Sequence, residues 1–301
     1  MSPWANLQSS ISTQVFTQTL TCVVLMIFSH IVSANDKVIA KIAMLKDTYE
    51  VYELDKLNNV CEDLRLFKGR PNHRMMVDLS LICQAFKAAN FDIQIALLIV
   101  PNYSRSLRDV SNGTMLMPAE TIWKEDVQGN PNVFISQDII RYGEFEKGLY
   151  TIVSHPLQKM ALEDIDFTQY SAITFRNWRH DLQALLQVTP KVLTSIQYDS
   201  IVNMLAAGRA DFSLIEFSGG KDFIFNHKGT LVKPVNGIKV RIMDARVFVM
   251  SKEVANSRMI FSALQTGLSK LRQANKIRPL YVTHGMINPQ VANWKVANPK
   301  D

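Results

Sequence analysis

The chain of 301 residues has only three cysteines and contains no repeats and no low-complexity tract. So few cysteines exclude a small protein held together by disulfides. A content of 47% hydrophobic and 20% charged residues excludes an intrinsically disordered chain. Long apolar runs are also lacking, which excludes a protein with several membrane spans. At about 100–200 residues per domain, the length predicts two domains, each with its own core.

Charge of one sign is not strongly dominant. The chain has 33 Lys and Arg against 27 Asp and Glu, a formal net charge of +6, and the excess is spread along the sequence. A diffuse excess predicts weak attraction to anions, whereas nucleic-acid binding needs a concentrated basic surface. We therefore expect no nucleic-acid partner.

The first 34 residues contain no Lys, Arg, Asp or Glu. Their apolar run, Cys22–Val32, is shorter than the roughly 20 residues of a membrane-spanning helix. Val32-Ser33-Ala34 follows, and polar sequence begins at Asn35. This pattern predicts a signal peptide over 1–34, cleaved after Ala34, and an exported protein. Because no basic residue precedes the apolar run, an uncleaved anchor or a misplaced start codon remains an alternative.

Catalytic signatures are lacking as well. The sequence has no G-x-S-x-G, H-E-x-x-H or P-loop motif, and no G-x-G-x-x-G after an expected strand. The five histidines after the leader are widely separated, and none has a His or Cys at the spacing of metal ligands. We therefore expect no metal, no cofactor and no enzyme. The histidines are His73, His155, His180, His227 and His284.

Two cysteines, Cys61 and Cys83, follow the leader. An oxidising compartment permits a disulfide between them. Both also fall on apolar stripes with helical spacing, where a free cysteine packs as a small hydrophobic residue. The sequence leaves both possibilities open.

Apolar runs that suit strands alternate with amphipathic segments that suit helices, which predicts an α/β fold with mainly parallel sheets covered on both faces. The expected strands are 38–45, 93–100, 114–119, 148–154, 171–175, 192–196, 211–217, 237–243 and 246–251. The expected helices are 50–67, 76–89, 104–110, 177–187, 199–207 and 257–275.

The order of several short motifs resembles the family 3 periplasmic solute-binding proteins, which have the type II binding-protein fold. In the first half, a helix, Gly113 and a strand are followed by Thr121-Ile122-Trp123-Lys124 and later by Phe134-Ile135-Ser136, where the family has Thr-x-x-Arg and Phe-Ser. In the second half, Leu205-Ala206-Ala207-Gly208-Arg209-Ala210-Asp211 precedes a strand that ends in Glu216. The Gly-Arg-Ala-Asp stretch is the most specific of these motifs.

The resemblance implies two lobes, each a mainly parallel sheet flanked by helices, joined by two hinge strands that allow closure around a ligand. It places lobe 1 at 35–152 plus 247–301 and lobe 2 at 156–243. The hinges would lie near Tyr150–His155 and Asp244–Val249.

Two departures from the family weaken the expectation of an α-amino-acid ligand. Lys124 stands where the family's Arg forks a ligand carboxylate, and Lys offers only a point charge. The second-lobe loop has Phe175-Arg176-Asn177-Trp178 in place of Gly-Thr at a helix start.

The candidate ligand-binding residues lie directly after expected strands. Trp123 offers a stacking surface, Arg176 and a helix capped by Asn177 offer an anion pocket, and Glu216 stands where the family binds an amine. Ordinary packing or surface roles are the alternative for each. The full set is Glu120, Thr121, Trp123, Lys124, Arg176, Asn177, Trp178 and Glu216, with Tyr49, Tyr103 and Tyr198 as weaker candidates.

The leading functional prediction is a soluble periplasmic protein that binds a small polar solute, anionic or amino-acid-like, for uptake by a membrane permease of the ABC-transporter type. The alternatives are a periplasmic sensor for a membrane signalling protein, or an exported enzyme on the same fold. An enzyme would need a general acid or base, for which Glu120 and Glu216 are the candidates.

Overall fold

The computed structural model describes residues 38–51, 60–63, 74–197, 199–217 and 221–299. The predicted signal peptide, residues 1–34, lies outside the described residues. Ile39–Asp301 form one compact unit. Within the described ranges, no helix combines the length and the apolar character needed to cross a membrane.

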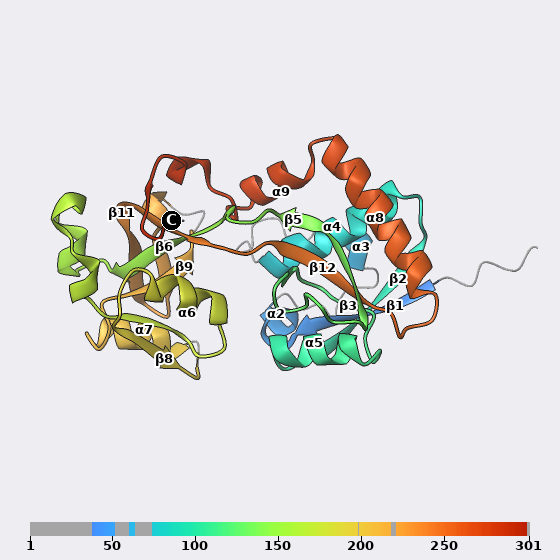
Figure 1. The fold of residues 1–301 in the computed structure, drawn as a ribbon, viewed down its shortest axis with the longest axis horizontal. Helices are drawn as coiled ribbons and strands as arrows, with labels where there is room; N and C mark the ends of the chain where they lie inside the picture. Colours follow the sequence, from blue (N-terminus) through green and yellow to red (C-terminus); the bar gives the residue numbers. More distant parts are fainter. Residues whose placement is uncertain (1–37, 52–59, 64–73, 198, 218–220, 300–301) are drawn as a thin grey trace, which may run out of the picture. The chain divides into compact units, whose positions relative to one another are not determined.

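Strands and helices alternate in part of the chain as the sequence predicts, but β3 to β7 and β9 to β12 each follow one another without an α-helix among the described residues, and β5 was not expected (Figure 1). The strands are β1 (Val38–Leu45), β2 (Ile93–Val100), β3 (Met117–Pro118), β4 (Ile122–Trp123), β5 (Val133–Ile140), β6 (Phe145–Ile152), β7 (Ala172–Phe175), β8 (Val192–Ser195), β9 (Phe212–Glu216), β10 (Phe225–His227), β11 (Thr230–Ile242), β12 (Arg246–Ser251) and β13 (Lys295–Val296). The α-helices are α2 (Lys46–Val51), α3 (Val60–Asp63), α4 (Arg74–Ala88), α5 (Tyr103–Ser111), α6 (Arg179–Leu186), α7 (Asp199–Ala206), α8 (Ser257–Gln273) and α9 (Ile277–Thr283). Short 3₁₀ turns are η4 (Pro156–Gln158), η5 (Leu162–Asp164), η6 (Phe167–Gln169), η7 (Lys221–Phe223) and η8 (Pro289–Val291).

The first lobe contains two three-stranded sheets, in the orders β2-β1-β3 and β4-β12-β5. Strands β1 and β3 are parallel, whereas β12 is antiparallel to both of its neighbours. One hydrophobic core joins the two sheets, because Ala43 of β1, Ile122 of β4 and Val249 of β12 pack in the same cluster. Helices α4 and α8 pack against each other beside these sheets (Figure 1).

The second lobe has a separate core on a seven-stranded sheet in the order β10-β11-β6-β9-β7-β8, with β13 paired to β11. The pairs β9–β7 and β7–β8 are parallel, and the pairs β10–β11, β11–β6 and β6–β9 are antiparallel. The sheet is therefore mixed, which differs from the mainly parallel sheet that the sequence predicts. The apolar face of α7 covers it with Ile201, Val202 and Leu205.

The strand pairs show at which positions the chain crosses from one sheet to another. Strand β6 pairs with β9 and β11, and β13 pairs with β11, so 145–152 and 295–296 hydrogen-bond within the second-lobe sheet. The sequence assigns both segments to the first lobe instead. The crossings lie between β5 and β6, between β11 and β12, and between α9 and β13. The division into lobes at 152, 156, 243 and 247 stays a prediction.

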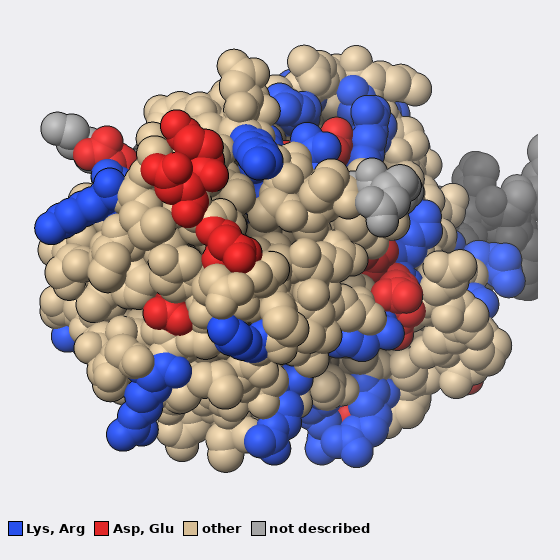
Figure 2. All heavy atoms as spheres, turned by 60° about the vertical axis from the view of Figure 1, so that its left-hand side comes forward, with Lys and Arg blue, Asp and Glu red and all other residues tan. Residues whose placement is uncertain are grey.

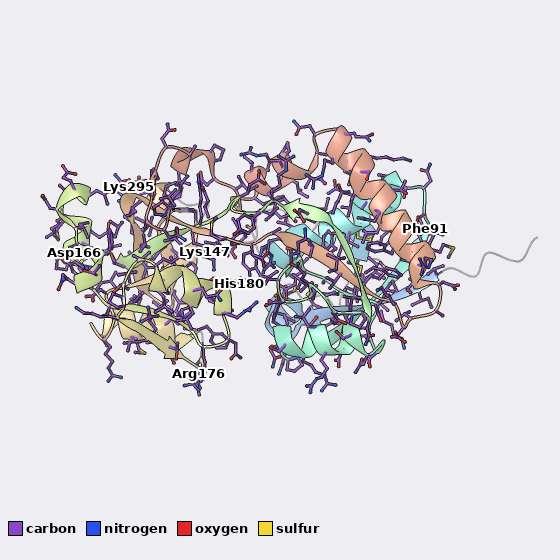
Figure 3. All side chains as sticks on the ribbon, in the orientation of Figure 1. Phe91, Lys147, Asp166, Arg176, His180 and Lys295 are labelled. Atoms are coloured by element: carbon purple, nitrogen blue, oxygen red, sulfur yellow. A yellow bond between two sulfur atoms is a disulfide. The ribbon has the colours of Figure 1, made fainter. Side chains whose placement is uncertain are left out.

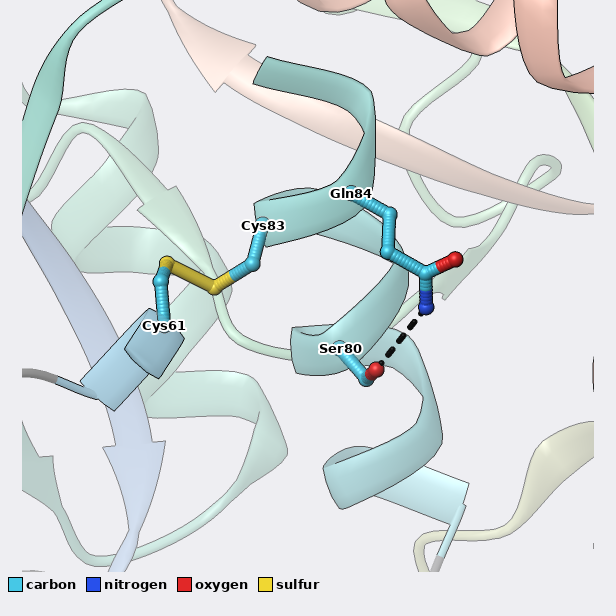
Figure 4. The surroundings of a disulfide bond; sticks show 4 residues. All are labelled: Cys61, Ser80, Cys83 and Gln84. Carbon is cyan, nitrogen blue, oxygen red and sulfur yellow. Dashed lines mark hydrogen bonds between the residues drawn. A yellow bond between two sulfur atoms is a disulfide. The ribbon is translucent and has the colours of Figure 1, made fainter. Parts of the chain in front are cut away.

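Cys61 and Cys83 form a disulfide that joins α3 to the middle of α4 (Figure 4). The Cα atoms are 5.4 Å apart, and the bond closes a loop with a sequence separation of 22 residues. The structure thus decides between the two roles that the sequence leaves open.

Charged side chains of both signs are interspersed over the face drawn in Figure 2. This agrees with the diffuse charge along the sequence.

Candidate ligand site between the two lobes

Arg74, the first residue of α4, contacts carboxylates from both lobes. Its guanidinium donates hydrogen bonds to Asp78 (3.1 Å) and Glu120 (2.9 Å), and its Nε lies 3.7 Å from Oε1 of Glu216 at the end of β9. Burial alone would lower the pKa of Arg74, but the charges of these three carboxylates outweigh it and raise that pKa. Arg74 therefore forms an ionic link between the first and the second lobe.

Asp78, one turn further along α4, is fully buried. It accepts hydrogen bonds from the backbone N–H (2.8 Å) and the hydroxyl (2.9 Å) of Thr121, and from the hydroxyl of Tyr281 in α9. Burial and the neighbouring Asp78 raise the pKa of Tyr281 well above its usual value. This network fixes the loop after β3 against α4, so the side chain of Thr121 has a packing role.

Arg246, at the start of β12, lies on the other side of Thr121. Its Nε donates to the Thr121 hydroxyl (3.1 Å), and its Nη2 donates to the Thr121 carbonyl. The guanidinium carbon lies 4.4 Å from the ring centroid of Trp123, a cation–π arrangement. Burial, together with the nearby charge of Arg74, lowers the pKa of Arg246.

Trp123 contacts the second lobe on its other side. Its ring meets Phe145 of β6 edge-on at 5.3 Å between centroids and lies 4.8 Å from the ring of His180 in α6. An aromatic residue at the meeting of the two lobes can stack on a ligand or on the opposing lobe.

Three carboxylates, from Glu125, Asp126 and Asp244, surround His180. Asp126 accepts hydrogen bonds from Tyr103 (2.7 Å) and from Arg179 (2.9 Å). Burial alone would raise the pKa of Asp126, but its contacts with His180, Tyr103 and Arg179 outweigh burial and lower that pKa.

The second-lobe side also holds a buried ion pair between Lys147 of β6 and Asp181 of α6, with 2.7 Å between Nζ and Oδ2. Burial raises the pKa of Asp181, and the charge of Lys147 partly offsets this. The ammonium of Lys147 lies 5.0 Å from the ring of Trp178. Figure 3 shows Arg176 at the lower edge of this lobe, away from Lys147 and His180.

The structure brings together four of the eight predicted ligand residues: Glu120, Thr121, Trp123 and Glu216. Trp178 lies beside this group through its contact with Lys147. Lys124 instead pairs with Asp138 at 2.9 Å. Arg176 and Asn177 are exposed, and α6 begins at Arg179 with Trp178 in the N-cap position and no side-chain cap. The prediction that Asn177 caps this helix is therefore wrong, and Arg176 does not join the group.

The sequence prediction missed Arg74, Asp78, His180 and Arg246. It also missed the charged residues around His180 and Trp178, which are Glu125, Asp126, Lys147, Arg179, Asp181 and Asp244. A signal existed for two of them. Asp78 interrupts the apolar stripe of an expected helix, and Arg246 begins a strand that is otherwise apolar. A charged residue within a buried element must have a partner, and it often marks a functional site.

No protein-family model and no curated protein sequence matches this chain. Among solved structures, it is similar to the probable amino-acid ABC transporter extracellular-binding protein of Bacillus subtilis, with a TM-score of 0.52 and 14% identity over 69% of this chain and 86% of that one. It is also similar to a double mutant of the BvgS VFT2 domain of Bordetella pertussis, with a TM-score of 0.51 and 13% identity over 83% of this chain and 93% of that one. The chain thus has the two-lobed α/β fold of the type II periplasmic binding proteins.

Proposed function

We propose that this protein is an exported solute-binding protein that closes its two lobes around a small polar solute. The observation that carries the proposal is the ionic link from Arg74 to Glu216, beside which Trp123 of the first lobe meets His180 of the second. In this fold, ligands bind where strand ends of the two lobes face each other, and hinge motion brings them together.

The charges at this position favour a solute that carries a positive charge. Seven carboxylates meet four basic side chains in three separate groups of ion pairs, around Arg74, around His180 and at Lys147, which leaves three negative charges when His180 is neutral. We therefore propose a cationic solute in place of the anionic one, whose expected pocket included Arg176. The carboxylates belong to Asp78, Glu120, Glu125, Asp126, Asp181, Glu216 and Asp244, and the basic groups to Arg74, Lys147, Arg179 and Arg246.

Two further observations support binding and export. Glu120, a candidate general base for an enzyme, is buried and ion-paired with Arg74, which suits a structural or binding role better than proton transfer. The Cys61–Cys83 disulfide suits an oxidising compartment such as the periplasm. A membrane permease that accepts the solute is the proposed partner.

A thermal-shift screen with probes sorted by charge tests the proposal. The probes are L-arginine, L-lysine and putrescine as cations, L-leucine as a zwitterion, and L-glutamate and succinate as anions. A cationic probe at 100 times its Kd should add about 2.7 kcal/mol to the free energy of unfolding. If only anions raise the melting temperature, the proposed positive charge of the solute is wrong. If neither these probes nor a wider panel of solutes raises it, the proposed binding function is wrong.

Glu216→Gln tests the position of the site. Removal of this carboxylate should weaken binding of the best cationic probe by about 10- to 150-fold, because a charge-assisted hydrogen bond contributes about 1.5–3 kcal/mol. Glu163→Gln is the matched control, since Glu163 is exposed in η5, remote from the ion pairs of the site. Calorimetry should show wild-type affinity for the control, and equal affinities for both variants would place the ligand elsewhere.

A further inference from the structure

His180 is a buried histidine without a well-aligned hydrogen bond at Nε2 among the described residues. Only 6% of its surface is exposed, although it is the second residue of α6. The ring of Trp123, 4.8 Å away, packs against the imidazole and limits its rotation. A buried polar atom without a partner costs free energy, so it calls for an explanation.

The imidazole is directed at carboxylates from separate parts of the chain. Nε2 lies 3.4 Å from Oδ1 of Asp126 and 3.8 Å from Oδ2 of Asp244, and Nδ1 lies 3.9 Å from Oε2 of Glu125. One nitrogen of His180 and one oxygen each of Glu125 and Asp244 all lie within 4.8 Å of one another. Glu125 and Asp126 follow β4, Asp244 lies between β11 and β12, and His180 is in α6, so both lobes contribute.

We propose that Glu125, His180 and Asp244 bind a divalent transition-metal ion, with Zn²⁺ as the best match, and that Asp126 completes the site. A neutral imidazole with carboxylate oxygens is a ligand set that Zn²⁺ accepts at about 2.0–2.2 Å. Tetrahedral ligands at that distance are roughly 3.3–3.6 Å apart. Movements on the order of 1 Å therefore bring the observed atoms to bonding positions.

Neighbouring groups already orient the carboxylates as an outer shell would. Oδ2 of Asp244 accepts from the backbone N–H of Glu125 (3.1 Å), and its Oδ1 accepts from the N–H of Ala245 (2.7 Å). Tyr103 donates to Oδ2 of Asp126, which leaves Oδ1 facing His180. Such outer hydrogen bonds fix ligand orientation in metal sites.

Arg179 supplies a positive charge that competes with a metal ion for the carboxylates of Asp126 and Glu125. Its Nη2 lies 2.9 Å from Oδ1 of Asp126 and 3.2 Å from Oε2 of Glu125. Because the side chain of Arg179 is 49% exposed, it can swing into solvent when a metal ion takes its place. The bound ion would join the second-lobe helix to first-lobe residues and so favour the arrangement in which these groups meet. The inference does not depend on which solute binds.

Calorimetry on the chelator-treated mature chain, residues 35–301, with ZnCl₂, MnCl₂ and MgCl₂ as probes tests this site. We expect one Zn²⁺ per chain, bound more tightly than Mn²⁺ or Mg²⁺. His180→Gln and Asp244→Asn should each weaken Zn²⁺ binding at least about 10-fold, because even the loss of a group that only orients a ligand costs about 10- to 100-fold. His155→Gln is the matched control, because His155 also faces a carboxylate, Asp211 at 3.1 Å, away from this cluster. That control should bind Zn²⁺ like the wild type.

Arg179→Ala gives a prediction of opposite sign. It should tighten Zn²⁺ binding, because it removes the cation that competes for Asp126 and Glu125. Visible absorption of the Co²⁺-loaded wild type provides a readout that does not require a variant to fold, and it should show a tetrahedral spectrum. Absence of stoichiometric Zn²⁺ binding, or binding that His180→Gln leaves unchanged, would overturn the proposal and show that His180 is only an ion-pair partner between the lobes. A bound Zn²⁺ would neutralise the group of Glu125, Asp126 and Asp244, so the solute screen is run on both the metal-free and the Zn²⁺-loaded protein.

Discussion

At the scale of single residues, the main feature of this protein is the set of buried charges where the lobes meet. Arg74, Asp78, Glu120 and Arg246 are each largely removed from water, and each has at least one charged or hydrogen-bonding partner. Burial of an ion pair gains little stability by itself, whereas removal of one partner leaves an uncompensated charge. The arrangement is therefore sensitive to substitution.

Asp78→Asn tests how far the network depends on its central carboxylate. Because Asp78 is fully buried and faces Arg74, its neutralisation should lower the free energy of unfolding by about 3–5 kcal/mol. Urea unfolding followed by circular dichroism measures the change.

Asp138→Asn is the control for that substitution. Asp138 pairs with Lys124 at the surface, where the two side chains are 33% and 41% exposed, so its loss should cost at most about 1 kcal/mol. If both variants lose the same stability, the Asp78 network does not have the role assigned to it.

The sequence identified only part of this site. Glu120, Thr121, Trp123 and Glu216 were predictable because each follows a strand whose end faces the other lobe. His180 was set aside because no ligand stands at a characteristic spacing in the sequence, and its neighbours Glu125 and Asp244 are 55 and 64 positions away. Contacts between distant segments depend on how the lobes pack, which local patterns do not encode.

At the scale of elements, the packing of α4 on α8 depends on a glycine. A Cβ added at Gly267 would lie 1.8 Å from the backbone oxygen of Ala85. The backbones of the two helices therefore approach too closely for any side chain at this position.

The substitution Gly267→Ala distinguishes the effect of this close helix contact on stability from the higher intrinsic helix propensity of alanine. In an exposed helix, Gly→Ala stabilises by about 0.5–1 kcal/mol. Here we expect the opposite sign, a loss of about 1–3 kcal/mol, because the helices must move apart. Ser262→Ala on the exposed side of α8 should leave the midpoint of thermal unfolding within a degree or two, or raise it. A stabilised Gly267→Ala variant would contradict the packing.

The disulfide between α3 and α4 should contribute about 3 kcal/mol, because it closes a loop with a separation of 22 residues. The double substitution Cys61→Ala and Cys83→Ala should lower the free energy of unfolding by about 3 kcal/mol. Thiol titration of the denatured mature protein gives a second check. The predicted cleavage after Ala34 would remove Cys22, so we expect a protein that begins at Asn35 to have no reactive thiol before reduction and two afterwards. Reactive thiols before reduction would show that the bond does not form in the exported protein.

Most strands and helices were predictable from the sequence, but the pairing of the strands into sheets was not. Apolar runs such as 93–100 and 172–175 became strands because β-branched and apolar residues favour a buried sheet. Strand β6 was predicted close to its position, yet its assignment to the first lobe differs from its pairing with β9 and β11. An apolar strand fits either sheet, so only the register of its hydrogen bonds decides.

At the scale of the whole molecule, two cores with connecting segments explain the function that we propose. Each lobe buries its own cluster, so the lobes can move as units about the crossings near β5–β6 and β11–β12. The order of weak motifs along the sequence predicted this two-lobed fold, although no single motif was decisive. It could not predict the positive charge that we propose for the solute, because that proposal depends on carboxylates gathered from both lobes.

Closure of the two lobes around a solute can be measured by small-angle X-ray scattering of residues 35–301, with and without the cationic probe that gives the largest thermal shift. We expect the radius of gyration to decrease when the probe binds, because the lobes close around it. Glu216→Gln should not show this decrease at the same probe concentration. A radius of gyration that stays the same when the probe is bound at saturation would contradict closure around a solute.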